Sequence, residues 1–133
     1  MATLLFELIS PERVLFSGDV RGVMLPATEG DMTVMAGHEP TMVMLNPGII
    51  AVTDSQGHGH RAFVRGGFVQ IINTGVSVLA ELALPPEELT RDRLDEEILR
   101  LETMREAMRE DKSRREADFA IGRLEQVKTT LSF

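Results

Sequence analysis

The stretch Leu25-Pro-Ala-Thr-Glu-Gly-Asp-Met-Thr-Val-Met-Ala-Gly-His-Glu-Pro40 joins two short apolar runs through a polar turn and ends at a second turn. The first turn is 28–31 and the second is 37–40. Each contains a glycine, which tolerates positive φ, beside polar residues that can hydrogen-bond their own backbone. The stretch contains no combination of side chains typical of a catalytic site. It therefore predicts a shaped surface between β-strands.

Short apolar runs separated by turn signals extend to both sides of this stretch, from the N-terminus to residue 84. We expect strands at 3–9, 14–16, 20–25, 32–35, 41–45, 48–53, 60–65, 67–72 and 76–83. In the first of them Leu4, Phe6 and Leu8 share one face. No helical pattern of ten residues interrupts these runs, which argues against a parallel β–α–β sheet. The pattern predicts an antiparallel sandwich or flattened barrel of nine or ten strands.

The composition changes at Pro85-Pro86. Residues 1–84 carry 4 basic and 8 acidic side chains, whereas residues 85–133 carry 10 and 13. Ten of the 11 glycines precede this point. We therefore expect two domains, 1–84 and 85–133.

Helical spacing replaces strand spacing after the two prolines. One apolar stripe comprises Leu94, Ile98, Leu101, Met104 and Met108, and a second comprises Ala117, Ile121, Leu124 and Leu131, with Val127 or Lys128 at the intervening turn. Between them Asp111-Lys112 interrupts the pattern, and Ser113 with Glu116 has the spacing of a capping box. Two helices joined by so short a turn are expected to pack antiparallel. The stripes are narrow and Gly122 costs about 1 kcal/mol relative to alanine, so the pair is expected to detach easily.

The bulk properties exclude several classes of function. A net charge of −7 argues against nucleic-acid binding and against adhesion to an anionic membrane surface. There is no cysteine, so neither disulfides nor thiolate chemistry are available. The N-terminus lacks the pattern of a signal peptide, and no window of 18 residues is apolar enough for a transmembrane helix. We expect a soluble protein inside the cell, without direct membrane insertion.

Motifs for phosphate binding, dinucleotide binding, zinc proteases and serine hydrolases are absent from the sequence. His58 and His60 flank a glycine at a predicted hairpin tip, where a solvated turn is favoured over a metal site. His38 suits either a turn-stabilising or a contact role. The methionines between Met24 and Met44 fit gap-filling or an adaptable contact face. We expect no enzyme activity, no metal and no cofactor.

Several short motifs occur together in a specific order. They are Phe16-Ser17-Gly18, Glu29-Gly30 followed by Gly37-His38-x-Pro40, Pro47-Gly48, Gly66-Gly67-Phe68-Val69, and Val76-x-Val78-Leu79-Ala80-Glu81, with a charged helical pair after them. Their order and spacing resemble the epsilon subunit family of F-type, proton-translocating ATP synthases over essentially the whole chain. The resemblance implies a ten-stranded antiparallel β-sandwich followed by an antiparallel two-helix hairpin.

The same resemblance implies a function. It is that of a non-catalytic subunit of the central stalk, which couples rotation of the c-subunit ring through the gamma subunit to the catalytic head. Such a subunit lies peripherally at the cytoplasmic face of the bacterial inner membrane. The resemblance implies a c-ring contact at Glu29, Gly30 and Asp31. It implies a contact with gamma and the ring at His38, Glu39, Pro40, Thr41 and Met42.

The helical part has two functions within the family. It can inhibit ATP hydrolysis by reaching the alpha and beta subunits, for which basic residues are available at Arg105, Arg109, Arg114, Arg115 and Arg123. Alternatively, it can act as an ATP-sensing regulatory module through the motif Ile/Leu-Asp-x-x-Arg-Ala. Leu89 and Arg93 fit that motif, but Thr90 replaces its Asp and Leu94 its Ala.

Overall fold

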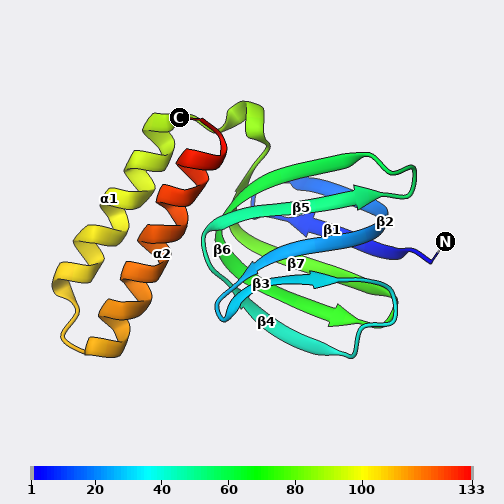
Figure 1. The fold of residues 1–133 in the computed structure, drawn as a ribbon, viewed down its shortest axis with the longest axis horizontal. Coiled ribbons are helices and arrows are strands. Elements are labelled where there is room, and N and C mark those ends of the chain that lie inside the picture. Colours follow the sequence, from blue (N-terminus) through cyan, green and yellow to red (C-terminus); the bar gives the residue numbers. More distant parts are fainter. Residues whose placement is uncertain (1, 133) are drawn as a thin grey trace. The chain divides into compact units, whose positions relative to one another are not determined.

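Seven β-strands form the first part of the chain and two α-helices the second (Figure 1). The computed structural model describes residues 2–132. The chain divides into two compact units, Met1–Pro86, here called the β unit, and Glu87–Phe133, here called the helical unit. The predicted fold, a β-sandwich followed by two helices, is confirmed at this level.

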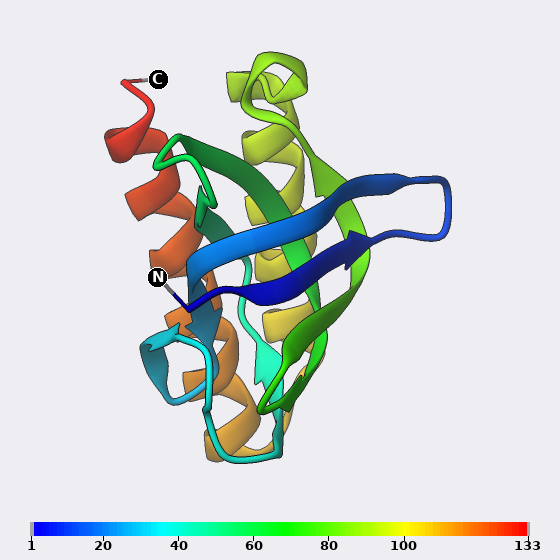
Figure 2. The ribbon, with the colours of Figure 1, turned by 90° about the vertical axis from the view of Figure 1, so that its right-hand side faces the viewer.

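The strands of the β unit are β1 (Leu4–Ile9), β2 (Val14–Ala27), β3 (Gly30–Val34), β4 (Thr41–Leu45), β5 (Gly48–Asp54), β6 (Gly59–Ile72) and β7 (Gly75–Leu84). Their order in the sheet is β1-β7-β6-β4-β2-β3, with β5 paired to both β2 and β6. β1 also pairs with the first part of β2, as an antiparallel hairpin that is visible in Figure 2. The two long strands β2 and β6 therefore connect the layers of the sandwich.

The expectation of ten antiparallel strands is wrong in number and in direction. The runs 14–16 and 20–25 belong to one strand, β2, and the runs 60–65 and 67–72 belong to another, β6. Gly18 continues β2 opposite Phe6, and Gly67 continues β6 across a register shift against β7. Neither glycine ends its strand, because the neighbouring strand continues the hydrogen-bond ladder past it. The sheet is mixed because β1 pairs with β7 in parallel.

The core of the β unit is built from alternate positions of these strands. Leu4, Phe6 and Leu8 are at most 2% exposed, which confirms that they share the inward face of β1. They belong to one cluster with buried side chains of the other strands, including Val20, Val23, Ile50, Val69 and Val78. Each large side chain buried in this way contributes roughly 1.5–3 kcal/mol. The β unit thus has a hydrophobic core of its own.

A short 3-10 turn, η1 (Pro86–Glu88), spans the boundary between the units in the sequence, and the helical unit contains two α-helices, α1 (Arg91–Ala107) and α2 (Asp111–Thr130). Thr90 caps α1, because its hydroxyl accepts a hydrogen bond from the backbone N–H of Arg93 at 3.1 Å. The prediction that Ser113 caps the second helix is wrong. The N-cap is Glu110, three residues earlier, and α2 begins at Asp111, whose negative charge in the first turn is favoured by the helix dipole.

The apolar stripes of the two helices are only partly buried. Leu94, Ile98 and Leu124 are at most 7% exposed, whereas Met104 is exposed. At the turn that the sequence left open, Val127 is the buried residue. The next residue, Lys128, instead forms an ion pair with Asp95 of α1. A second ion pair, Arg105–Asp118, joins the other ends of the helices. The two pairings run in opposite order along the chain, as antiparallel helices require.

Candidate interaction surfaces

The predicted c-ring contact forms the tip of the hairpin between β2 and β3. Ala27 pairs with Gly30, so the turn itself consists of Thr28 and Glu29. Gly30 has φ +129, a conformation that a residue with a side chain adopts only under strain. Glu29 and Asp31 are both exposed. The tip therefore presents two carboxylates on a turn whose shape requires glycine.

Backbone hydrogen bonds from the β4–β5 turn hold this hairpin in place. The N–H of Thr28 donates to the carbonyl of Met44 at 3.0 Å, and the N–H of Asn46 donates to the carbonyl of Pro26 at 2.8 Å. The side-chain amide of Asn46 also reaches the carbonyl of Ala27 at 3.4 Å. These bonds tie the end of β2 to the end of β4. The acidic tip is consequently a fixed feature of the β unit.

The second predicted contact, 38–42, lies in the connection between β3 and β4 and in the first residues of β4. Gly37 has φ +87, and its N–H donates to the carbonyl of Asn73 in the β6–β7 turn at 2.9 Å. His38 is half-buried; its N–H donates to the carbonyl of Met35 at 3.3 Å, and its Nδ1 lies 2.7 Å from the carbonyl oxygen of Glu39. His38 thus stabilises the turn, while the next four positions, Glu39, Pro40, Thr41 and Met42, are exposed.

The two predicted contacts are not brought together. β3 begins with Gly30 and Asp31 of the acidic tip and leads at its other end to the connection that carries His38. Four steps of about 3.4 Å each lead from Gly30 to Val34, a length of about 14 Å. The tip and His38 therefore lie at opposite ends of one strand.

An exposed apolar row crosses β4, β6 and β7, and only its methionines on β4 fall among those that the sequence suggests for a contact face. Met44 pairs with Phe68, and Phe68 pairs with Leu79. These side chains are 58%, 38% and 44% exposed, and Met42 on the same face of β4 is 64% exposed. We call Met42, Met44, Phe68 and Leu79 the apolar face. One feature of the sequence indicates this face: β4 is apolar at successive positions, a pattern expected of a strand that is covered on both sides.

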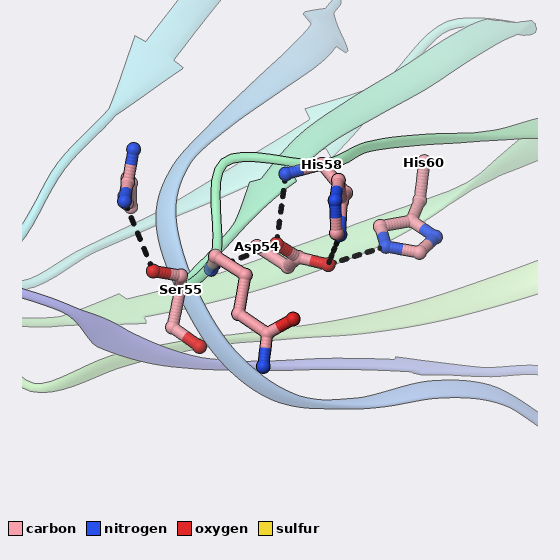
Figure 3. Close-up of polar contacts among 6 residues, drawn as sticks. Asp54, Ser55, His58 and His60 are labelled. Atoms are coloured by element: carbon pink, nitrogen blue, oxygen red, sulfur yellow. Dashed lines mark hydrogen bonds and ion pairs between the residues drawn. The ribbon is translucent and has the colours of Figure 1, made fainter.

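Asp54 organises the tip of the hairpin between β5 and β6 (Figure 3). Its carboxylate accepts hydrogen bonds from the N–H groups of Gln56 and His58, both at 2.9 Å, and from Nε2 of His60 at 2.8 Å. The ring of His60 also lies against Phe16, with centroids 5.3 Å apart. Within the part of the chain that the structure describes, no group of three or more histidine or carboxylate side chains is arranged to hold a metal ion. These polar groups shape a turn.

The charge of Asp54 is stabilised by this arrangement. Hydrogen bonding from His60, followed by that from His58, lowers the pKa of Asp54 from 3.8 to about 2. A lowered pKa stabilises the folded tip above pH 3.8, and this contribution disappears as the pH falls through about 2. We expect a carboxyl 13C NMR titration of Asp54 to have its midpoint near 2. The substitution His60→Ala should move it toward 3.8. A midpoint near 3.8 in the unaltered chain would contradict the arrangement.

The basic residues proposed for inhibition occupy different situations in the helical unit. Arg105 forms an ion pair with Asp118 and thereby joins α1 to α2. Arg109, Arg114 and Arg115 are exposed, and Arg123 is half-buried. Three of the five guanidinium groups are thus freely accessible from solvent along the α1–α2 turn and the first turns of α2.

The degenerate nucleotide motif has a structural explanation. Leu89 is 4% exposed, and Thr90 and Arg93 form the cap of α1 described above. A threonine at this position supplies the hydroxyl that the helix start requires.

Among the described residues, neither helix is long and apolar enough to cross a membrane.

Comparison with known proteins identifies the family. The model of the ATP synthase delta/epsilon chain β-sandwich domain matches residues 3–86. The ATP synthase epsilon chain of Parvibaculum lavamentivorans is 50% identical over 93 residues, which are 70% of each chain. That of Rhizobium etli is 48% identical over 113 residues, which are 84% of each chain.

Solved structures agree in fold. A chain in the cryo-EM structure of the Euglena gracilis mitochondrial ATP synthase, comprising OSCP, F1 and c-ring, has a TM-score of 0.74 at 23% identity, over 98% of this chain and 82% of that one. A chain from the central stalk and c-ring of the Tetrahymena thermophila enzyme has a TM-score of 0.55 at 13% identity, over 68% and 72%. The resemblance inferred from the sequence is confirmed, and the chain belongs to the family of ATP synthase epsilon subunits.

Proposed function

We propose that this chain is a non-catalytic rotor subunit of the ATP synthase central stalk, coupling rotation of the c ring through the gamma subunit to the catalytic head. The observation that carries the proposal is the 50% identity to an ATP synthase epsilon chain over 70% of both chains. On this proposal the chain lies peripherally at the cytoplasmic face of the bacterial inner membrane. The bacterial relatives named above support that location.

The gamma subunit is the proposed partner of the apolar face and of the adjoining segment 38–42. Three exposed apolar side chains in register across three strands, with Met42 beside them, favour a protein partner, because such a surface gains free energy when water is removed from it. Met42 belongs to both the segment and the face. A lasting contact of this kind is expected to bury roughly 800 Å² on each partner.

The c ring is the proposed partner of Glu29, Gly30 and Asp31. Two exposed carboxylates on a hairpin held by Asn46 suit polar or basic loops on a second partner. Because this tip and His38 lie at opposite ends of β3, one β unit can contact gamma and the ring at the same time. Its packed core gives the stiffness that transmission of torque needs.

Co-purification tests the proposed function directly. An affinity-tagged chain, expressed in the organism that encodes it, should elute with the gamma subunit in equal amounts after mild detergent extraction of membranes. In a control without the tagged chain, neither gamma nor the c ring should be recovered in the eluate. A tagged chain that elutes without gamma would refute the proposal.

A regulatory function of the helical unit is proposed as well. Lys128–Asp95 and Arg105–Asp118 are ion pairs between the two helices in which each carboxylate is about half exposed, and such pairs contribute little. Gly122 lies in open space and weakens α2 further. The buried contact of the helical unit is small, with Leu94, Ile98 and Leu124 as its largest apolar side chains, so these helices can leave their folded arrangement at moderate cost. The exposed arginines could then contact the alpha and beta subunits and oppose hydrolysis.

Deletion of residues 87–133 is expected to raise ATP hydrolysis by the assembled enzyme about fivefold or more, since a regulatory coupling is typically worth 1–3 kcal/mol. ATPase activity of the purified complex measures the effect. Arg114→Gln combined with Arg115→Gln keeps both helices and should reproduce part of the increase. Unchanged hydrolysis after the deletion would contradict an inhibitory role.

A further inference from the structure

A second surface of the β unit lies outside all the contacts proposed above. It is a shallow groove of about 570 Å³ over the outer face of β2, β3, β5 and the beginning of β6. Its lining residues are Arg21, Gly22, Val23, Met24, Thr33, Met35, Ala51, Val52, Thr53, Gly59, His60 and Arg61. All of them belong to the β unit, and none belongs to the apolar face, to the acidic tip or to segment 38–42.

The groove exists because small residues meet across neighbouring strands. Gly22 of β2 pairs with Thr53 of β5, and Thr53 pairs with Gly59 of β6. Two of the three positions in this row therefore have no side chain, and the floor of the groove is backbone on both sides of Thr53. The exposed methionines Met24 and Met35 line the groove beside this row.

The fold does not require glycine at either floor position. Neither Gly22 nor Gly59 has a positive φ. A Cβ at Gly22 would lie 3.6 Å from the Val34 carbonyl oxygen and 3.8 Å from Cγ of Met35, and one at Gly59 would lie 4.0 Å from the Val52 carbonyl oxygen, which are ordinary contact distances. Glycine inside a strand is unfavourable, and it often marks a place where another backbone approaches closely. The open floor is thus suited to an extended chain lying across it.

The charges around the groove specify the occupant. Two of the four arginines of the β unit, Arg21 and Arg61, line it, and no acidic residue does. This is a positive site on a unit with twice as many acidic as basic side chains. Arg21 uses one nitrogen to donate to the carbonyl of Ser55 at 3.1 Å, which fixes the side chain beside the groove and leaves other donors of its guanidinium group. Arg61 is exposed.

We propose that this groove binds an extended, acidic segment of another subunit of the assembled ATP synthase. The backbone of the segment lies on Gly22 and Gly59, an apolar side chain packs between Met24 and Met35, and carboxylates face Arg21 and Arg61. This contact is additional to those with gamma and the ring, and it rests on the proposed assembly into the central stalk.

A single cysteine at the centre of the groove tests the proposal. The chain has no native cysteine, so Thr53→Cys introduces a unique thiol at an exposed position between the two glycines. The rate of alkylation by a maleimide is compared between the isolated chain and the purified complex. We expect alkylation in the complex to be about tenfold slower or more, because an occupied site reacts only when it is vacated.

A benzophenone maleimide attached to the same cysteine then identifies the occupant by mass spectrometry. The proposal predicts a crosslink to an acid-containing segment of another subunit. Equal alkylation rates, a crosslink to the helical unit or to a second copy of the chain, or a crosslinked segment without acidic residues would each overturn it. If the variant copurifies with gamma while its thiol stays reactive, the groove proposal fails and the rotor function stands. If it does not copurify, both fail.

Adding side chains at the two glycines of the groove floor provides an independent test of the proposed binding. Gly22→Ala with Gly59→Ala should leave the melting temperature unchanged or raise it, since both positions have room and alanine restricts the unfolded chain. The same variant should abolish the benzophenone crosslink from residue 53. Gly18→Ala is the matched control, because Gly18 lies in β2 outside the groove with ordinary space around it. Retention of the crosslink in the filled variant would contradict close approach of a backbone.

Discussion

Gly67→Ala is expected to lower the free energy of unfolding of the β unit by about 3–5 kcal/mol, through backbone strain and overpacking together. Gly67 has φ +137, which residues with a side chain rarely adopt. A Cβ there would lie 2.8 Å from the Cα of Ala80 and closer still to the carbonyl oxygen of Leu79. Both obstacles are backbone of β7, the neighbouring strand. Urea denaturation followed by circular dichroism measures the loss.

The adjacent glycine gives a matched control. Gly66 has ordinary φ, and a Cβ there would meet only the carboxylate end of the Glu81 side chain, at 3.7 Å. Gly66→Ala should therefore cost much less than Gly67→Ala. If the two substitutions are equally tolerated, the register shift at this point of β6 is not the feature that requires glycine.

Phe68→Glu is expected to weaken binding to the gamma subunit by about 30-fold or more, because a central aromatic anchor is often worth at least 2 kcal/mol. Phe68 lies between Met44 and Leu79, so a carboxylate here would lose apolar contact and place an unpaired charge in the middle of the row. Because Phe68 is 38% exposed, the β unit should still fold. Titration of the purified gamma subunit with each form of the chain in a calorimeter gives the dissociation constant.

Gln56→Glu is the control for this experiment. It adds the same negative charge at an exposed tip that belongs to neither the apolar face nor segment 38–42. Because solvent screens an exposed charge, this substitution should leave the dissociation constant for gamma within about twofold of that of the unaltered chain. Equal weakening by both substitutions would show that net charge, and not the apolar face, governs the binding.

Much of the fold could be predicted from local chemistry. The turns around Gly30, Gly37 and Gly57 lie where glycine and polar residues coincide, and all three glycines have positive φ. The same reasoning failed at Gly18 and Gly66, which separate the predicted strands but lie within continuous ones. Whether a glycine ends a strand or lies within it depends on the partner strand. That information is non-local and cannot be read from the residues on either side.

Long-range strand pairing also limits how much of the candidate sites can be predicted from the sequence. The parallel pairing of β1 with β7 joins segments about 70 residues apart, and no local pattern encodes it. Met44, Phe68 and Leu79 likewise form one surface only through strand register. Single turns such as 28–31 were identified because all of their determinants are adjacent in sequence. The groove over Gly22, Thr53 and Gly59 needed three strands to be aligned before it could be recognised.

The most direct measurement of the central claim joins the acidic tip to the ring in a working enzyme. A cysteine introduced by Asp31→Cys is crosslinked to a cysteine in the polar loop of the c subunit, and ATP-driven proton pumping is recorded before and after crosslinking. A chain that turns with the ring can be fixed to it without loss, so we predict a high yield of crosslink and unchanged pumping. Pumping that stops on crosslinking, or the absence of a crosslink, would show that this chain is not part of the rotor.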